Sequence, residues 1–425
     1  MNNSKKIVAF SSTDCCALVA FDVAKDSLSY RSQMLDILET REIPNSFGAA
    51  LSTLDELRNG AMASGFTDIH IVLEPTGVYH KPLVAAAKKL SVSREWIKTE
   101  VLAKLRFVES GDDGKSDVKD PRVLELAAAL GKTMILRDLD KPYSLLREWG
   151  ATYDAAERGL VAAKCRIHPL LKQLLPEFDF GNDFLYGPSG TAFVERFGAN
   201  PFKVTRDGIK AFKTRMKRAA PRIRARSIER LYEHARAALR SGLDQDLAEV
   251  LEIRIRQAWE DLTTGLARRQ EAAAKLEELY DQARQDDPDL PQPTEGVITK
   301  LQGGRLVAES GPLRDFRTGD QLLRYLSMNL VGNDSGQQRG RVRTSKKGRR
   351  RGSKVAHQVA FALSKRNRLF GDFYHDKKER MGGTKAMTAT ARKWLLMIFG
   401  WYRSGREFDL DRVFRSESQY LAKAA

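Results

Sequence analysis

Two short stretches determine the fold of the first part of the chain: LVAFD, residues 18–22, and DIHIVLE, residues 68–74. Each is an apolar run, rich in β-branched residues, that ends in an acid. Such runs predict buried strands, which places Asp22 and Glu74 at the carboxyl ends of two strands.

A third acidic motif, KSDVKD, ends at residue 120 and spaces two aspartates three residues apart, which predicts neighbours on one helix face. Carboxylates that converge repel one another, and a divalent cation is the usual way to stabilise such a cluster. Two Mg²⁺ ions about 3.5–4 Å apart would hold the attacking and leaving oxygens of a phosphoryl transfer. We therefore predict a site for Mg²⁺, or Mn²⁺ in its place, made by four acids: Asp22, Glu74, Asp117 and Asp120.

Each motif also has an ordinary interpretation. An acid after a strand is often solvated or a cap, and Asp117 and Asp120 could be first-turn residues of a helix that begins near Pro121, where acids favour the helix dipole. The order of the motifs favours the metal site. A strand with Asp, a hairpin-like stretch through residues 28–43, a helix, a strand with Glu and helix-borne acids form the layout of an RNase H-like domain.

The motifs FDVAK, LEPTG and KSDVKDP, in this order, resemble those of the DEDD transposases of bacterial insertion sequences, the recombinases guided by a bridge RNA. The resemblance implies a RuvC-like N-terminal domain whose four acids bind metal. It continues into FRTGDQLLRYLSMNLVGNDSGQQRGRVRTSKKGRR, which looks like the second domain of that family. There the family carries a catalytic serine in a Ser-Gly step, and Ser335 followed by Gly336 matches it.

The resemblance also implies an activity and partners. Ser335 would attack a DNA phosphodiester and form a phosphoserine link, and a structured noncoding guide RNA would pair with donor and target DNA. Members combine the acidic domain of one protomer with the serine domain of another, which implies a homodimer, a tetramer at synapsis and a place at the nucleoid in the bacterial cytoplasm. The chain departs from the family where TEGVITKLQGGRLVAESG keeps only part of a glycine-rich helix-hairpin-helix signature.

From the residues alone, other functions stay open. Asn333 to Gly336 are turn formers, and a serine hydroxyl is a poor nucleophile unless it is activated, so Ser335 could be a loop residue that only hydrogen-bonds DNA. A Holliday-junction resolvase would use the same four acids with water as its nucleophile. A noncatalytic nucleic-acid-binding scaffold would need only the basic segments.

The charge of the chain points to a polyanionic partner. Lys and Arg number 72 against 55 Asp and Glu, a net charge of +17. A membrane surface could also attract it, but no run approaches the ~18 apolar residues of a spanning helix and no signal peptide is evident. Three cysteines without metal-ligand spacing, Cys15, Cys16 and Cys165, indicate a reduced cytoplasm and no disulfide framework.

Basic residues concentrate in two places. Residues 339–354 hold nine Lys or Arg and no acid, which predicts nucleic-acid binding. A second cluster, from Lys203 to Arg240, is either the exposed face of helices or a contact with a nucleic-acid backbone. The predicted nucleic-acid-binding residues are Arg339, Arg341, Arg343, Lys346, Lys347, Arg349, Arg350 and Arg351.

The middle of the chain is predicted to be helical. Apolar residues between Leu251 and Tyr280 follow spacings of three, four and seven, as in a coiled-coil seam or in packing within one chain. Prolines in residues 285–293 end this helix, and residues 176–203 show too little periodicity to place. We predict an RNase H-like (RuvC-like) α/β domain at 1–145, a helical coiled-coil section at 146–290 and a mostly helical serine-bearing domain at 291–425.

Overall fold

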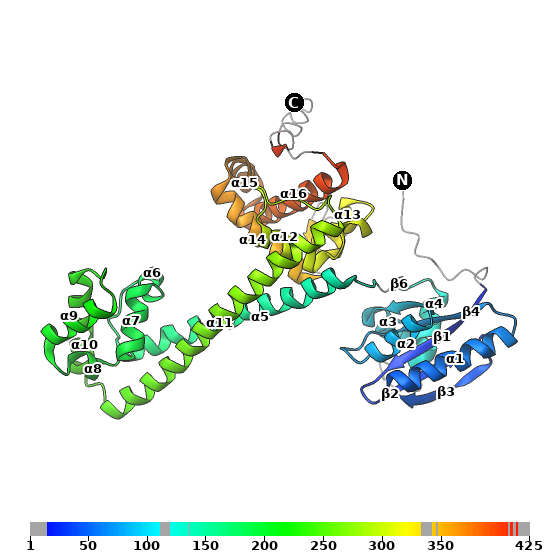
Figure 1. Ribbon diagram of the computed structural model, residues 1–425, viewed down its shortest axis with the longest axis horizontal. Coiled ribbons are helices and arrows are strands. Elements are labelled where there is room, and N and C mark those ends of the chain that lie inside the picture. Colours follow the sequence, from blue (N-terminus) through cyan, green and yellow to red (C-terminus); the bar gives the residue numbers. More distant parts are fainter. Residues whose placement is uncertain are drawn as a thin grey trace, which may run out of the picture. The chain divides into compact units, whose positions relative to one another are not determined.

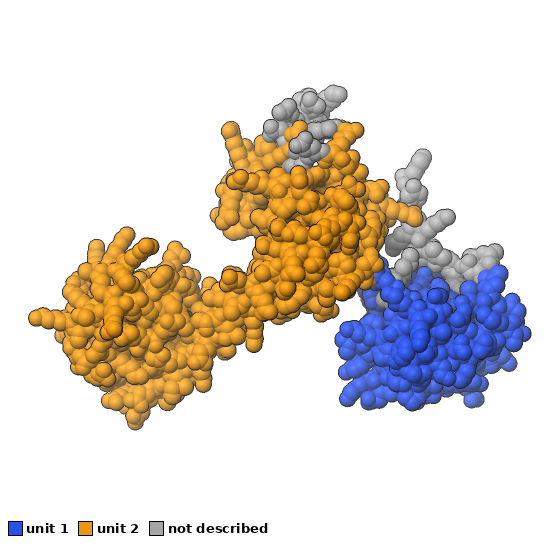
Figure 2. Space-filling view, in the orientation of Figure 1, with its two compact units in different colours: residues 1–138 blue, residues 139–425 orange. Residues whose placement is uncertain are grey.

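A computed structural model describes residues 15–110, 120–135, 137–332, 342–345, 347–406, 409–410 and 414. Its chain forms two compact units, residues 1–138 and 139–425 (Figure 2). The first contains a mixed sheet with helices, and the second is mostly helical, which confirms the predicted order of an α/β part and a helical part. The predicted three-part division at residues 145 and 290 stays a prediction.

The first unit is built on a six-stranded sheet of order β3-β2-β1-β4-β5-β6 (Figure 1). β1, β2 and β3 pair antiparallel, β1, β4 and β5 pair parallel, and β6 is antiparallel to β5. The two predicted strands and the predicted hairpin are confirmed. The strands are β1 (Cys16–Val23), β2 (Ser27–Ser32), β3 (Ile37–Pro44), β4 (Asp68–Leu73), β5 (Ser93–Ile97) and β6 (Thr133–Ile135).

Helices cover both faces of this sheet, because the central strands are apolar on both sides. Phe21 and Leu73 pack under α1 and α2, whereas Ala20 and Val72 pack under α3 and α4. Side chains alternate between faces along a strand, so one strand feeds both cores. The helices are α1 (Phe47–Ala63), α2 (Lys81–Lys89), α3 (Thr99–Ser110) and α4 (Asp120–Ala129).

Two long helices run antiparallel through the second unit: α5 (Lys141–Leu174) and α11 (Gln245–Asp286) (Figure 1). At Gly265 the helices approach closely, since a β-carbon there would lie 3.0 Å from Cδ2 of Leu160. Most of the predicted seam of α11 is buried by this intramolecular packing, although Leu266 is 43% exposed. Packing within the chain therefore accounts for most of the seam.

One end of the pair carries a small helical bundle that includes residues 176–203, which the sequence did not place. Its core joins aromatic side chains such as Phe193 and Phe212 to Leu251 and Trp259 of α11. The bundle helices are α6 (Asn182–Leu185), α7 (Pro188–Phe197), α8 (Pro201–Thr205), α9 (Gly208–Ala219) and α10 (Ala225–Arg240).

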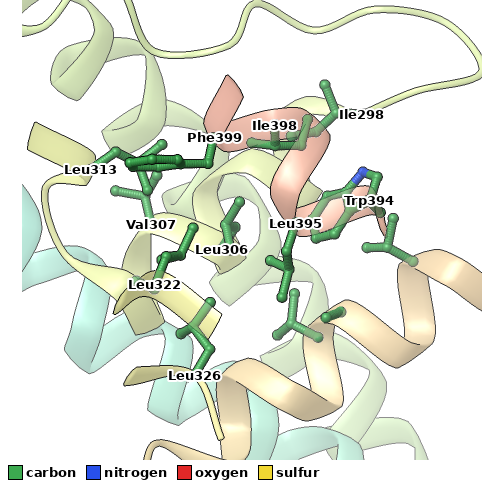
Figure 3. Close-up of a cluster of buried hydrophobic side chains, with 14 of the residues drawn as sticks. Ile298, Leu306, Val307, Leu313, Leu322, Leu326, Trp394, Leu395, Ile398 and Phe399 are labelled. Carbon is green, nitrogen blue, oxygen red and sulfur yellow. The ribbon is translucent and has the colours of Figure 1, made fainter. Parts of the chain in front are cut away.

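The other end carries the C-terminal helices around a second core (Figure 3). Trp394 is fully buried there, and its indole Nε1 donates to the carbonyl oxygen of Val297 at 3.1 Å. A β-carbon at Gly304 would lie 2.6 Å from the carbonyl oxygen of Leu276, so glycine lets α12 approach α11 closely. The elements are α12 (Lys300–Ser310), the 3₁₀ helix η1 (Leu313–Asp315), α13 (Gly319–Tyr325), β7 (Leu330–Gly332), β8 (Val342–Thr344), α14 (Arg350–Arg366), α15 (Arg368–Met381) and α16 (Gly383–Ser404).

Candidate catalytic residues and nucleic-acid interface

The sheet register places Asp22 and Glu74 side by side. Phe21 of β1 pairs with Leu73 of β4 in a parallel ladder, and the residue that follows each is the acid, Asp22 still within β1 and Glu74 directly after β4. Because Phe21 and Leu73 face α1 and α2, alternation directs Asp22 and Glu74 to the face covered by α3 and α4. Both acids are buried, at 7% and 6% exposure.

Asp120 joins this face from a helix. It is the first residue of α4, which packs against β1 and β4, and it is 1% exposed. An acid in the first turn is stabilised by the positive end of the helix dipole. Three of the four predicted acids therefore lie on the same side of the sheet, and Asp117 lies outside the described residues.

The sequence reasoning missed an arginine that lies among these acids. Arg106 of α3 donates from Nε to Oδ1 of Asp120 at 2.6 Å, and its Nη2 lies 3.7 Å from Oε2 of Glu74. Arg106 is buried, at 9% exposure. A signal was present, because Arg106 follows the buried Leu102 by four residues and so occupies a position where helical periodicity expects an apolar side chain.

A second buried charge holds α4 in place. Glu125 accepts hydrogen bonds from Arg31 of β2 at 2.6 Å and from the backbone N–H of Gln33 at 2.7 Å. Burial raises the pKa of the Glu125 carboxyl, and the Gln33 N–H and the Arg31 charge oppose that effect only in part. This tie between α4 and β2 fixes the helix that presents Asp120.

The donor chemistry of the three acids suits a hard divalent cation, which prefers carboxylate oxygens. Oδ2 of Asp120 is buried and has no hydrogen-bond partner among the described residues. No group of three Asp, Glu, His or Cys side chains is close enough to hold an ion within that part of the chain. A bound ion would therefore need the fourth acid, or a shift of Arg106 away from Glu74 and Asp120.

The predicted nucleophile falls in the interval between two strands of the second unit. β7 and β8 pair antiparallel, with Val331 opposite Arg343. The intervening residues 333–341, which include Ser335, Arg339 and Arg341, lie outside the described residues, as does Lys346.

The structure separates the other predicted basic residues into two groups. Arg343, Lys347 and Arg350 are exposed. Arg349 donates to Glu309 of α12 at 3.0 Å, and Arg351 lies 3.9 Å from Asp154 of α5. Two of the predicted contacts thus hold elements of the fold together through ion pairs.

One face of α14 lines a pocket of about 760 Å³, which Thr344 at the end of β8 also lines. Phe361 is 55% exposed on this face, and Nζ of Lys365 lies 5.0 Å from its ring centre. An exposed aromatic ring beside cations is a platform on which a nucleic-acid base can stack. The pocket residues of α14 follow one another at helical spacings of three, four and seven from Arg350, so the sequence contained the pattern that places them on one face. The lining residues are Ser327, Thr344, Arg350, Ser353, Lys354, His357, Gln358, Phe361 and Met387.

A buried aspartate lies beneath this basic face, and Glu157 of the same helix lies 3.5 Å from Nζ of Lys354. Asp154 of α5, 6% exposed, accepts from Lys354 and from Arg158 and lies near Arg351. Burial alone would raise the pKa of the Asp154 carboxyl, but the Lys354 hydrogen bond and the charges of Lys354, Arg158 and Arg351 outweigh burial, so this pKa lies below its usual range. Asp154 is therefore an anion held by three cations.

His357 packs between two helices within the same pocket. Its Nδ1 lies 2.8 Å from the carbonyl oxygen of Ser353, and its Nε2 lies 3.2 Å from Oγ1 of Thr388 on α16. Both ring nitrogens are engaged, so His357 is a packed side chain. Among the residues that the structure describes, no helix is long and apolar enough to span a membrane.

Comparison with known proteins finds a family likeness within the second unit. No curated protein matches the chain. Residues 297–375 match a family model described as "Transposase IS116/IS110/IS902 family". The matched region begins in the core around Trp394 and includes α12, the β7–β8 pair with the Ser335 segment, and the pocket face of α14. This match supports an insertion-sequence transposase of that family, acting on DNA.

Proposed function

We propose that this protein is a transposase that cuts and rejoins DNA through Ser335 together with a divalent-metal site of Asp22, Glu74, Asp117 and Asp120. The observation that carries the proposal is that Asp22, Glu74 and Asp120 are all buried on the same side of the sheet. The strand order, a three-stranded antiparallel meander continued by two parallel strands, supports an RNase H-like domain. The family match over the Ser335 segment supports the transposase chemistry.

The reaction would be a transesterification. Oγ of Ser335 attacks a DNA phosphorus, loses its proton and forms a P–O bond, while the P–O bond to the DNA sugar breaks and the leaving oxygen takes up a proton. A DNA hydroxyl then reverses the step on a new strand. Arg350 and Lys354 in the pocket are placed to hold phosphates and to neutralise their charge. A divalent cation on the four acids would supply Lewis-acid polarisation of the phosphate.

Ser335→Ala tests the nucleophile. Wild type incubated with donor and target DNA should yield a denaturation-resistant protein–DNA adduct whose phosphate maps to Ser335, and the variant should yield none. Ser353→Ala, in the pocket, is the matched control and should still form the adduct. Cleavage that persists in Ser335→Ala without an adduct would favour the resolvase, in which water attacks.

Single replacements of the acids, Asp22→Asn, Glu74→Gln, Asp117→Asn and Asp120→Asn, test the metal site. Each should abolish DNA joining while the protein stays folded, because the change keeps the shape of the side chain and removes its charge. Asp68→Asn, at the start of β4 and paired with Arg58, is the control and should stay active. Activity in two of the four variants would refute the assignment. Wild-type protein that binds DNA but neither cuts nor joins it would favour the noncatalytic scaffold.

Guidance by RNA and the oligomeric state complete the proposal. Its support is the resemblance of FDVAK, LEPTG and KSDVKDP to the RNA-guided recombinases, together with the net charge of +17. Sequencing the RNA that co-purifies with the protein should return one structured species. Light scattering should give a homodimer, and a tetramer with both DNAs bound. If RNase treatment abolishes recombination while untreated protein stays active, guidance by RNA is supported. Recombination that is unchanged after RNase treatment would contradict it.

A further inference from the structure

The helical bundle at the far end of α5 and α11 has a strongly basic corner. We call residues 217–226, KRAAPRIRAR, the corner segment; it joins α9 to α10. It contains five cations and no acid, and all five are exposed: Lys217, Arg218, Arg222, Arg224 and Arg226.

The corner differs from the rest of its bundle in how its charges are paired. Elsewhere between residues 203 and 240, six of the eight Lys and Arg side chains form ion pairs with acids, for example Lys203 with Glu252 and Arg230 with Asp179. Across the described parts of the chain, no acid lies within ion-pair distance of any cation in the corner segment. The acids of the bundle thus pair with cations outside the corner segment, and the positive charge of the corner segment is not neutralised by an ion pair with a described acid.

The backbone of the corner is held rigidly. Ala220 and Ile223 are buried in the bundle core, and the N–H of Ile223 donates to the carbonyl oxygen of Ala220 at 3.0 Å. Nζ of Lys217 donates to the carbonyl oxygen of Ile223 at 2.6 Å and closes the turn. A fixed turn presents the arginines without a further loss of backbone entropy on binding, which favours affinity.

This charge arrangement does not favour the fold itself. Arg224 is the N-cap of α10 and makes no side-chain capping bond, and the first turn of the helix contains no acid. Cations at the positive end of a helix dipole are unfavourable. Arg224 and Arg226 therefore occupy positions at which folding alone would favour acids, and a bound anion would relieve the repulsion.

We propose that the corner segment binds the phosphodiester backbone of a nucleic-acid duplex. The guanidinium fork of arginine matches phosphate oxygens and stays charged at every physiological pH. A lipid surface fits poorly, because the segment exposes no large apolar side chain that could insert. Backbone contacts of this kind add affinity and register and do not choose the sequence.

The proposal goes beyond the catalytic function, because the corner lies outside the matched residues 297–375 and its binding is measured without recombination. DNA and RNA duplexes share the backbone chemistry, so both are probed. The test uses the full chain with Arg222→Gln, Arg224→Gln and Arg226→Gln combined. The matched control, Arg206→Gln, Lys213→Gln and Arg236→Gln, removes the same charge from ion-paired cations of the same bundle.

Fluorescence anisotropy with short labelled duplexes of one sequence, as DNA and as RNA, gives affinity against salt. The slope of log K against log salt should fall by roughly 2 to 3 for the corner variant, about 0.9 for each lost phosphate contact on B-DNA, and should stay unchanged for the control. A fall on one duplex alone identifies that nucleic acid as the ligand. An unchanged slope on both duplexes, or an equal fall in the control, overturns the proposal.

Ultraviolet cross-linking of the wild-type complex supplies an independent readout. Peptides that span residues 217–226 should carry cross-linked nucleotide, and their absence when other basic peptides are recovered also counts against the proposal. Thermal melts verify the fold of each variant. If the triple variant fails to melt cooperatively, the pair Arg222→Gln and Arg226→Gln is measured in its place, with the same expectation for two contacts.

Discussion

The two candidate functional regions have opposite charge arrangements. In the first unit one buried arginine, Arg106, lies between the acids Glu74 and Asp120. In the second unit one buried aspartate, Asp154, lies among the cations Lys354, Arg158 and Arg351. In each region the minority charge has the sign of the ligand that we propose, a cation among acids and an anion among bases.

The two regions differ in their access to water. The side chains of Arg106, Glu74 and Asp120 are at most 10% exposed, whereas the cations around Asp154 are 40–62% exposed. Charges shielded from water interact strongly and are costly to leave unpaired, whereas exposed charges are screened. The first region should therefore depend on its counter-ion for stability, and the second should use its cations for binding.

Arg106→Gln should produce the largest effect. It leaves Glu74 and Asp120 buried without their cation, which should lower the free energy of unfolding by about 3–5 kcal/mol. Mn²⁺ or Mg²⁺ should restore part of that loss if the acids can then take a metal. Urea unfolding with and without metal measures both effects. Arg58→Gln, which breaks a partly exposed pair with Asp68, is the control and should cost less than about 1 kcal/mol. Equal losses in the two variants would contradict the comparison.

Arg349→Gln should have the next largest effect, because it breaks the ion pair of the basic region whose acid is least exposed to solvent. Glu309 is 3% exposed and would be left as a buried carboxylate without its cation. We expect a loss of about 2 kcal/mol in the free energy of unfolding. Chemical denaturation measures it, and a loss below that of Arg58→Gln would show that Arg349 is available to bind nucleic acid after all.

Asp154→Asn should change stability in a pH-dependent way. The folded pKa of Asp154 lies below its unfolded value of about 3.9, so its charge stabilises the fold above that pH, and the contribution fades as pH falls through the folded pKa. The variant should be less stable than wild type near neutral pH and equally stable in strong acid.

The same variant should bind nucleic acid more tightly, because Lys354, Arg158 and Arg351 lose their common anion. Asp261→Asn breaks an exposed pair with Arg166 and is the control for both measurements. Anisotropy with duplex DNA measures the affinity. A stability difference that persists in strong acid, or affinity equal to that of the control, would argue against Asp154 as the counter-ion of a phosphate-binding face.

Lys347→Gln with Arg350→Gln should have the smallest effect on folding, within about 0.5 kcal/mol, because both side chains are exposed. Their effect should appear in binding, with a salt slope shallower by roughly 0.7 to 0.9 for each lost phosphate contact. Arg368→Gln with Arg380→Gln, which carries the same charge change on α15, should leave the slope as it is.

Much of the first unit could be predicted from the sequence. The runs that end in Asp22 and Glu74 are strands, and the stretch through residues 28–43 is a hairpin, because strand periodicity and β-branched residues are local signals. Arg106 was missed because the sequence of α3 alone does not indicate which acids its side chain contacts. Its position on the apolar face of the helix acquires a meaning only when Asp120 is folded against it.

In the second unit the sequence located the basic run but did not show which of its cations form ion pairs and which are exposed in the pocket. Arg349, Arg350 and Arg351 are consecutive and chemically identical, yet one pairs with Glu309 of α12, one is exposed in the pocket and one lies near Asp154 of α5. Successive residues at the start of a helix point in directions about 100° apart, and the acids that they meet come from distant parts of the chain.

The sequence by itself therefore determined the two strands that lead to Asp22 and Glu74, the hairpin and the positions of the two basic clusters, since each depends on residue type and short-range spacing. Only the tertiary structure decided which of these charges are paired. It placed Arg106 among acids, Asp154 among cations and the corner segment beyond the reach of any acid that the structure describes. The physical reason is that charge pairing depends on distance and on burial, and both are set by the packing of segments far apart in the chain.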